Sequence, residues 1–458
     1  MNNLPPSNQR LNYVVIICDD IGWGDPGCYG HPSLQTPALD ELAREGTRFD
    51  AFYAGQPVCS ASRVALLTGC MPAKAGVTRL IGSGTGNNRI GSGIHLARHR
   101  PTVAQWVQKL GYQTACFGKW HLGFLEPEFS QPPSDFGFDY AFCTVSNSPF
   151  KDPDNWHRNG APLGPLPGYA TDIMMADVLR WLREERRPDD PFFLYLPFHA
   201  PHEPVGAADE YVARYATEEP PEKRQYYGAV SQMDAACGRL FAALRASGEW
   251  DRTMILFTSD HGPEYRNEHS YGSAGPFRGK KLHLYEGGIR VPGILRWPGR
   301  TRPGTVCTEP VCHFDLLPTL LAAEGAPEEG VPGVDGTSFL PALEERALQR
   351  QRPLAWWFPM GMPKGPEGPV LALRRNRWKL LLSRAFVEEQ RTPGAEGTEL
   401  YDLQDDPAET RNRCGDEPER VRAMTEELLA IRAENEAALK EARRYMDPVP
   451  PGLENRKA

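Results

Sequence analysis

Residues 13–20 read YVVIICDD, a continuous apolar and largely β-branched run that ends in two aspartates. Such a run is typical of a strand that is buried on both faces of a parallel sheet. Further along, Thr36 and Pro37 lead into ALDELAREG, which predicts a helix with a capping residue, a proline at its first position and a closing glycine. A buried strand followed by a helix is the repeating unit of α/β folds.

The alternation of strands and helices continues along the chain. Further helices are predicted near 102–110, 171–186 and 226–246, and further strands near 113–117, 192–198 and 253–258. This order predicts an α/β fold with a large, mostly parallel central sheet flanked by helices. The glycine-rich stretch GSGTGNNRIGSG at 82–93 follows no predicted strand, so we interpret it as a mobile loop rather than a phosphate-binding one.

The pattern changes after about residue 345. Three short strand candidates follow, VLALRR, RWKLLLS and GTELYDL, before a charged helix from about 417 to 446. We therefore expect two domains, a main domain over residues 1–345 and a smaller C-terminal α+β domain over residues 346–458. The smaller domain is expected to carry a short antiparallel sheet.

The composition is that of a globular protein without a nucleic-acid-binding face. Hydrophobic residues make up 40% of the 458 residues and charged ones 24%, and the net charge is −8. No apolar run is long enough to span a membrane, and the first ten residues do not resemble a signal peptide. We expect a cytoplasmic protein, or a secreted one if a leader has been removed.

The ten cysteines are scattered and form no Cys-x-x-Cys pair. This spacing predicts reduced, mostly buried thiols rather than a disulfide framework or a zinc site. One of them, Cys59, opens CSASR and stands four residues before Arg63 at the start of a helix-like run. A free cysteine is more often a small buried side chain than a nucleophile, so CSASR alone leaves both interpretations open.

Four predicted strands end in polar side chains. The residues after these strands are Asp19-Asp20, Lys119-Trp120-His121, His199-Ala200-Pro201-His202 and Asp260-His261-Gly262. Open α/β sheets bind their ligands at the carboxyl ends of the strands. Any one of these groups could cap a loop, but four at one edge of a sheet predict a binding or catalytic site.

The acidic residues among them fit a metal site. Asp19 and Asp20 would repel each other unless a cation neutralises them. Asp260 and His261 could complete the ligands of that cation.

The basic residues fit the binding of a tetrahedral anion. Arg63, Lys119, His121 and Lys281 would supply positive charge and hydrogen-bond donors. His202 is a candidate acid or base near neutral pH.

With these motifs assembled, the chain resembles the formylglycine-dependent sulfatases (arylsulfatase-like) of the alkaline phosphatase superfamily. The motifs that carry the resemblance occur in the order of the family and cover nearly the whole length. They are VVIICDDIGWGD, CSASRVALLTG, GYQTACFGKWHLG, FLYLPFHAPHEP, ILFTSDHGP, FRGKKLHLYEGGIRVP, HFDLLPTLL and LYDLQDDPAE.

The resemblance implies a nucleophile and a metal. Cys59 matches the cysteine that a maturation enzyme oxidises to formylglycine, whose hydrated aldehyde attacks sulfur, and Arg63 matches the arginine that holds it. The implied ligands of one divalent cation, usually Ca²⁺, are Asp19, Asp20, Asp260, His261 and the modified Cys59.

The resemblance also implies how sulfate is bound and released. Lys119 and Lys281 match the lysines that bind sulfate oxygens, and Lys281 has the spacing of the family because it stands four residues before Tyr285. His121 matches the histidine that assists the diol and drives sulfate release. His202, with Lys281, matches the leaving-group side, and His199 is interpreted as supporting structure.

Two positions depart from the commoner pattern. Ala61 stands where proline is usual, so the sequence leaves open whether a formylglycine-generating enzyme or an anaerobic sulfatase-maturating enzyme accepts this site. His261 stands where asparagine is usual. An imidazole ligand weakens the case for Ca²⁺ and leaves Mg²⁺ or Mn²⁺ open, because Ca²⁺ prefers oxygen ligands.

The implied activity is hydrolysis of a sulfate monoester, either an aryl or a carbohydrate sulfate. One alternative is a phosphodiesterase or phosphonate monoester hydrolase of the same superfamily, and another is a catalytically silent, metal-bound binding protein. Trp356, Trp357 and Trp378, with Arg374 and Arg375 nearby, could contact a sugar or could belong to the core and surface of the smaller domain.

Overall fold

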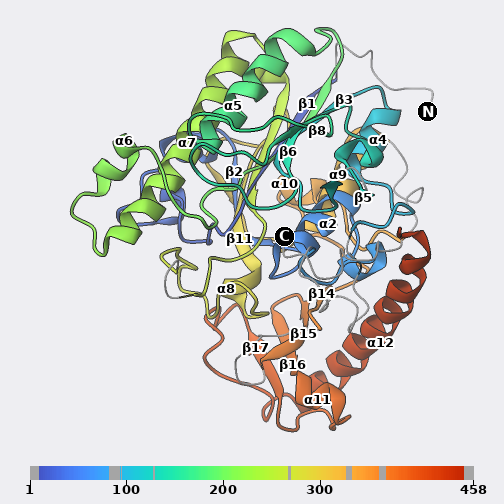
Figure 1. Cartoon of the computed structure of the whole chain (residues 1–458). Coiled ribbons are helices and arrows are strands. Elements are labelled where there is room, and N and C mark those ends of the chain that lie inside the picture. The colour runs from blue at the N-terminus through green and yellow to red at the C-terminus, as the bar shows by residue number, and fades with distance from the viewer. Residues whose placement is uncertain are drawn as a thin grey trace.

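The strand predicted from YVVIIC is β1 (Asn12–Cys18), and it lies inside an 11-stranded sheet (Figure 1). The structure is a computed structural model that describes residues 10–81, 93, 95–126, 129–266, 270–325, 333–359 and 368–447. Apart from Gly93, the glycine-rich stretch interpreted as a mobile loop lies outside the described residues.

The strands at the centre of this sheet are parallel. They run in the order β10 (Thr253–Ser259), β1, β9 (Phe192–Pro197), β3 (Gln113–Lys119) and β6 (Tyr140–Thr144). Beyond β10, β11 (Arg290–Arg296) is antiparallel to both β10 and β2 (Thr47–Tyr53). The remaining short strands are β12 (Thr305–Cys307), β13 (Val311–Cys312), β7 (His157–Arg158) and β8 (Ala161–Pro162) at the edges, and the separate pair β4 (Leu125–Glu126) and β5 (Phe129–Ser130). The predicted fold class is confirmed.

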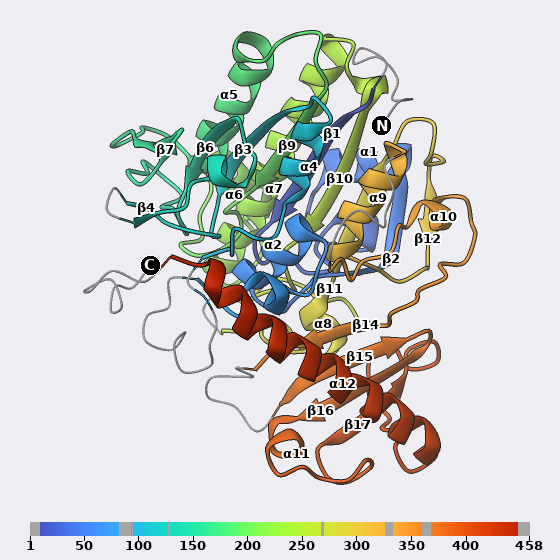
Figure 2. The same ribbon diagram turned by 90° about the vertical axis from the view of Figure 1, so that its right-hand side faces the viewer.

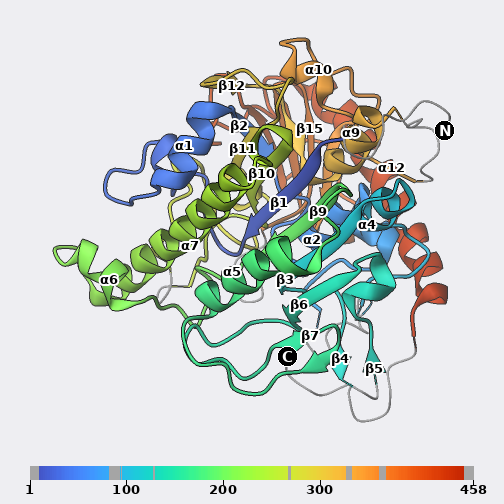
Figure 3. The same ribbon diagram turned by 90° about the horizontal axis from the view of Figure 1, so that it is seen from above.

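Helices cover both faces of the sheet (Figure 3). One face carries α1 (Pro37–Glu45), α5 (Ala170–Arg180) and α7 (Pro221–Ala246), and the other carries α2 (Cys59–Thr68), α4 (Val103–Lys109) and α9 (Leu316–Ala323). In β1, Val14 and Ile16 pack with the first set, whereas Val15 and Ile17 pack with the second. Because successive side chains face opposite sides, burial of both faces explains the continuous apolar run.

The start of α1 differs from the prediction. The side chain of Thr36 does not cap the helix, because its Oγ1 accepts from the backbone N of Gly27 at 2.8 Å and contacts Asp40 at 3.1 Å. The carboxylate of Asp234 on α7 accepts instead from the backbone N–H groups of Ala38 and Leu39, at 3.0 and 2.8 Å. A side chain distant in sequence has therefore taken the capping role.

A small antiparallel sheet follows residue 345. Its strands are β14 (Leu354–Trp357), β15 (Pro369–Arg375), β16 (Trp378–Ser383) and β17 (Thr398–Asp402), and α11 (Arg384–Glu388) follows β16. Figure 2 shows α12 (Pro418–Ala442) running from this sheet toward the main body. Leu380 and Leu382 pack with Leu428 of α12, whereas Leu381 points to the other face and joins the main core. The predicted antiparallel sheet is confirmed, while the division into domains at residue 345 stays a prediction.

Three short helices lie in the connections, namely α6 (Asp209–Val212), α8 (Glu286–Ile289) and α10 (Leu340–Leu343). All ten cysteines are unpaired thiols, and eight of them are buried. Across the described ranges, no helix is both long and apolar enough to cross a membrane.

Candidate active site

The residues predicted for the site come together at one edge of the main sheet. β10, β1, β9 and β3 are consecutive neighbours, so their parallel carboxyl ends lie side by side. Asp260 donates its backbone N–H to Cys18 O at 2.9 Å, and Asp19 donates to Ala200 O at 3.4 Å, which ties the loops after three of these strands to one another. This edge is where an α/β sheet binds its ligand.

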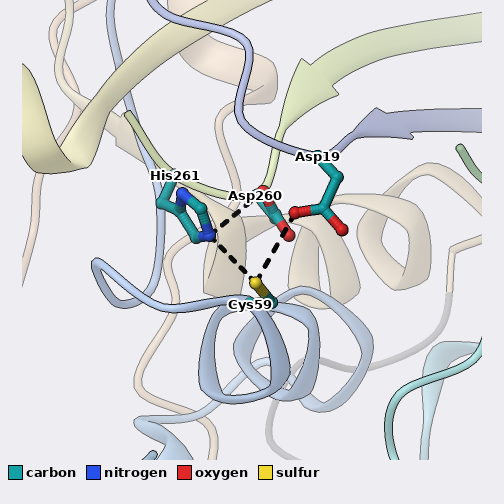
Figure 4. A group of neighbouring side chains, drawn as sticks. All are labelled: Asp19, Cys59, Asp260 and His261. Carbon is teal, nitrogen blue, oxygen red and sulfur yellow. Dashed lines mark hydrogen bonds and ion pairs between the residues drawn. The ribbon is translucent and has the colours of Figure 1, made fainter. Parts of the chain in front are cut away.

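Cys59 occupies the first position of α2, and its thiol faces the strand ends (Figure 4). The side chain is buried, with Sγ 3.1 Å from His261 Nε2 and 3.5 Å from Asp19 Oδ1. The unpaired N–H groups and dipole of a helix N-terminus favour negative charge here. Cys59 is thus placed where an anionic nucleophile or substrate oxygen would be stabilised.

Arg63 lies one helical turn after Cys59 and is fully buried. Its Nε and one Nη donate to Asp260 Oδ2 at 3.2 and 3.0 Å, and the same Nη donates to Asp19 at 3.2 Å. The other Nη donates to Lys119 O at 2.9 Å. Burial alone would lower the pKa of Arg63, but Asp260 and Asp19 raise it above its usual value. The guanidinium therefore stays charged and joins the ends of three strands.

Asp19, Cys59, Asp260 and His261 form a compact cluster in which each offers one atom within 4.8 Å of the others (Figure 4). Asp20 lies beside it, with Oδ1 3.5 Å from His261 Nδ1, and forms a second group with Asp19 and His202. Buried carboxylates together with an imidazole are a suitable donor set for a divalent cation. The residues present therefore fit the predicted metal.

Burial and neighbouring charges shift the pKa values of these groups in opposite directions. Burial disfavours the charged form of Asp19, but Lys119, His202 and Arg63 outweigh it and hold its pKa well below the usual range. Burial dominates at Asp20 and raises its pKa to about 6 despite Lys281. Burial disfavours the protonated form of the His261 imidazole, yet Asp260 and Cys59 raise its pKa to about 10. Adjacent groups with separated pKa values are typical of functional sites.

Lys119 and Lys281 approach the two aspartates from opposite segments. Lys119 Nζ lies 2.5 Å from Asp19 Oδ2, and Lys281 Nζ lies 2.8 Å from Asp20 Oδ1. The segment with Lys281 packs closely on the loop after β10, since an added Cβ at Gly262 would lie 1.9 Å from Gly287 O. That close approach requires glycine at position 262. Lys281 also donates its backbone N–H to Pro263 O at 2.9 Å, which holds its segment against this loop.

The two histidines flank this cluster. His121 has a left-handed backbone (φ 53°), its Nε2 lies 3.3 Å from Ile81 O, and its buried Nδ1 has no hydrogen-bond partner in the described part of the chain. His202 Nδ1 donates to Glu203 O at 2.8 Å, and its Nε2 lies 3.7 Å from Asp20 Oδ2. Burial, together with nearby lysines, lowers the pKa of both histidines well below the usual value. Strained backbone of this kind is concentrated at functional sites.

Other residues contact the site although the sequence analysis did not single them out. Asn147 Oδ1 accepts from Lys119 Nζ at 2.7 Å, and Glu264 Oε2 lies 3.4 Å from Lys281 Nζ. Asn147 follows β6, which is parallel to β3, so its place after a fifth strand end on the same edge could have identified it as a site residue. His199 Nε2 lies 2.7 Å from Thr144 Oγ1 and its ring packs on Trp156, which is consistent with a supporting place.

The tryptophans of the C-terminal part are mainly structural. Trp356 is fully buried and donates Nε1–H to Ala54 O at 2.8 Å, and Trp357 is buried as well. Trp378 is half-buried beneath the guanidinium of Arg420, 4.5 Å from its ring centre. The interpretation of Trp356 and Trp357 as core residues is therefore correct, and neither ring is available to a sugar.

Comparisons with known proteins agree with this geometry. The family model "Sulfatase" matches residues 11–326, and the model "N-sulphoglucosamine sulphohydrolase, C-terminal" matches residues 275–434. Arylsulfatase A of Homo sapiens is 32% identical over 93% of this chain and 89% of its own length. N-acetylgalactosamine-6-sulfatase of Sus scrofa is 33% identical over 76% of this chain and 69% of its own length.

A solved structure, that of Ps i-CgsB, superimposes with a TM-score of 0.80 at 25% identity and covers 95% of this chain and 94% of that one. The family model spans well over half of the chain, and the similarity to arylsulfatase A spans nearly all of it. The chain belongs to the sulfatase family of sulfuric ester hydrolases.

Proposed function

We propose that this chain hydrolyses an aryl or carbohydrate sulfate monoester with the side chain of residue 59 as nucleophile. The observation that carries the proposal is the position of Cys59 Sγ, 3.1 Å from His261 and 3.5 Å from Asp19 at the start of a helix. A maturation enzyme of the formylglycine-generating or anaerobic type would oxidise Cys59. Cys59 Sγ marks the place of the oxygens of the oxidised side chain.

Asp19, Asp20, Asp260 and His261 would hold one divalent cation together with residue 59. The carboxylates favour Ca²⁺, and the imidazole of His261 keeps Mg²⁺ and Mn²⁺ as alternatives. When present, the cation and the formylglycine supply Lewis-acid stabilisation of sulfate oxygens and a nucleophilic oxygen.

The remaining residues bind the substrate and move protons. Lys119 and Lys281 bind sulfate oxygens, where they offset charge that develops in the transition state. Arg63 holds the carboxylates of Asp19 and Asp260 in register with residue 59. His121 takes a proton at its Nε2 or Nδ1 as sulfate is released. The bound anionic ester favours the charged form of His202, whose Nε2 then delivers a proton to the leaving oxygen beside Lys281.

Mass spectrometry of the peptide around Cys59 tests the nucleophile. Active protein from its native host should show formylglycine at residue 59. Full activity with an unmodified thiol at this position would contradict the proposal.

Matched substrates test the reaction class. We expect 4-nitrophenyl sulfate to be hydrolysed faster than 4-nitrophenyl phosphate, because a single cation with lysines offsets less charge than a phosphomonoester carries. A 4-nitrophenyl phosphonate, which carries the same charge as the sulfate, is compared in the same assay. A clear preference for the phosphate or phosphonate would assign the chain to phosphoester chemistry. Failure to turn over any of them, or any sugar sulfate, in metal-loaded, formylglycine-containing protein would favour a silent binding protein.

A further inference from the structure

Arg79 is a largely buried arginine with no carboxylate beside it in the described part of the chain. Only 8% of the residue is exposed, its Nε has no hydrogen-bond partner, and its guanidinium forms no ion pair with any described residue. The other arginines buried to this degree are paired. Arg63 contacts Asp260, and Arg296 contacts Asp251 at 3.0 Å.

An unpaired buried cation is energetically unfavourable. Removing a charge from water is costly unless a partner compensates for it. Burial lowers the pKa of Arg79, and no carboxylate acts against it. A position that serves packing alone would be more stable with an apolar side chain. These properties are expected of an arginine whose counter-charge is supplied by a bound ligand.

The backbone next to Arg79 is fixed to the catalytic residues. Ile81 donates its N–H to Ser60 Oγ at 3.0 Å, and Ile81 O lies 3.3 Å from His121 Nε2. Ser60 is the neighbour of Cys59 on α2. Two residues of extended chain span about 7 Å, so the backbone of Arg79 lies within about that distance of Ile81. The long side chain of Arg79 therefore starts close to the site, within reach of a substrate that is bound there.

We propose that Arg79 binds a second anionic group of the substrate, a sulfate or a carboxylate, in addition to the sulfate that is cleaved. The inference deepens the proposed function and rests on it. It names the substrate class as a saccharide that carries at least two negative charges, either multiply sulfated or containing a uronic acid. A guanidinium suits this role because its fork of N–H donors matches both oxyanions.

Matched substrates that differ by one anionic group test the proposal. The panel consists of monosaccharide and disaccharide 6-sulfates, each paired with the same sugar carrying one further sulfate and with the same sugar carrying one further carboxylate. We expect at least one doubly charged member to be preferred about ten- to hundredfold in kcat/KM, the size of one charge-assisted hydrogen-bonded pair. The sulfate and carboxylate arms show which anion Arg79 recognises.

Variants of Arg79 assign that preference to the residue. In Arg79→Met the preference should fall to about onefold, and Arg79→Lys should keep part of it. Arg183→Met removes an exposed arginine elsewhere, whose side chain is 69% exposed, and should keep the full preference. The melting temperature of Arg79→Met should equal or exceed that of the wild type, because an unpaired buried charge has been removed.

Two outcomes would overturn the proposal. One is the absence of any preference for a doubly charged member in the wild type, and the other is a preference that survives in Arg79→Met. Calorimetric binding of the same sugars to metal-loaded protein with an unmodified Cys59 thiol separates this inference from the proposed function. Loss of affinity for the doubly charged sugar in Arg79→Met supports the role of Arg79 even if no sulfate ester is turned over.

Discussion

Lys379 Nζ lies 2.8 Å from Glu286 Oε1, and this buried ion pair joins the small antiparallel sheet to the segment that carries Lys281. Lys379 is on β16, whereas Glu286 opens α8 only five residues after Lys281. Glu409 completes the contact, since it lies 2.9 Å from Lys379 Nζ and accepts from the backbone N of Glu286 at 2.7 Å. The small sheet therefore supports the position of a residue proposed to bind sulfate.

Replacing Lys379 should destabilise the protein strongly. Lys379→Met leaves Glu409 buried without a cation and leaves Glu286 with Arg290 alone, 3.2 Å away, so we expect a loss of about 3–5 kcal/mol in the free energy of unfolding. Urea denaturation at pH 7.5 measures it. Arg375→Met on the neighbouring strand β15 is the matched control. The side chain of Arg375 is 42% exposed and pairs with Glu427, so its loss should cost less than about 1 kcal/mol. Equal effects of the two substitutions would contradict this role of Lys379.

Glu409 should make stability depend on pH. Burial raises the pKa of Glu409 to about 7, although Lys379 acts in the opposite direction. Between the unfolded pKa near 4.5 and the folded value, the folded state holds a proton that the unfolded state has lost. This stabilisation is present below about pH 4.5 and is lost as the pH rises through about 7.

The variant Glu409→Gln isolates that contribution. The decline in the free energy of unfolding between pH 5 and pH 8 should be smaller than in the wild type by up to about 3 kcal/mol, from 1.36 kcal/mol per pKa unit. Lys379 and Arg290 outweigh burial at Glu286 and lower its pKa to about 2, so its own contribution changes below pH 4.5 and leaves this window undisturbed. Parallel pH curves for variant and wild type would show that Glu409 does not titrate there.

Loss of the cation should abolish turnover without unfolding the chain. Chelation, or Asp19→Asn, removes several kcal/mol of transition-state stabilisation, which corresponds to about a thousandfold in kcat/KM. Circular dichroism should remain close to that of the wild type, because the apolar side chains of β1 keep both faces of the sheet packed. Asp50→Asn, on β2 and outside the cluster, should retain activity. Activity in protein shown to be metal-free would exclude the site.

Local patterns were sufficient to predict the sheet and the strand-end residues. The apolar run of β1 and the polar residues after β1, β3, β9 and β10 are signals within a few neighbouring positions. Contacts between distant positions left no such signal. Lys379 lies in the strand sequence WKLLLS like a solvent-facing lysine, yet it is fully buried because Glu286, 93 residues earlier, reaches it.

Contacts between distant positions also explain why the predicted cap of α1 was wrong and why Asn147 was missed. Thr36 has the sequence of a cap, but Asp234 competes for the same N–H groups from 196 residues away. Asn147 follows a short strand whose polar neighbours resemble any loop, and only the spatial order of β3 and β6 places it beside Lys119. Side chains that complete a site from another element require the fold before they can be recognised.

The effect of His202 should depend on the leaving group. His202 Nε2 lies 3.7 Å from Asp20 Oδ2, on the side where Lys281 also reaches, which fits a group that delivers a proton to the departing oxygen. An alcohol needs this proton in the transition state, whereas 4-nitrophenolate leaves readily without it. His202→Ala should therefore lower kcat/KM by about 10²–10⁴-fold for a sugar sulfate and by less than about tenfold for 4-nitrophenyl sulfate. His199→Ala, which removes a contact to Thr144 away from the leaving oxygen, should affect both substrates alike. A loss in His202→Ala that is equal for the two substrates would mean that the residue positions the sulfate instead of protonating the leaving group.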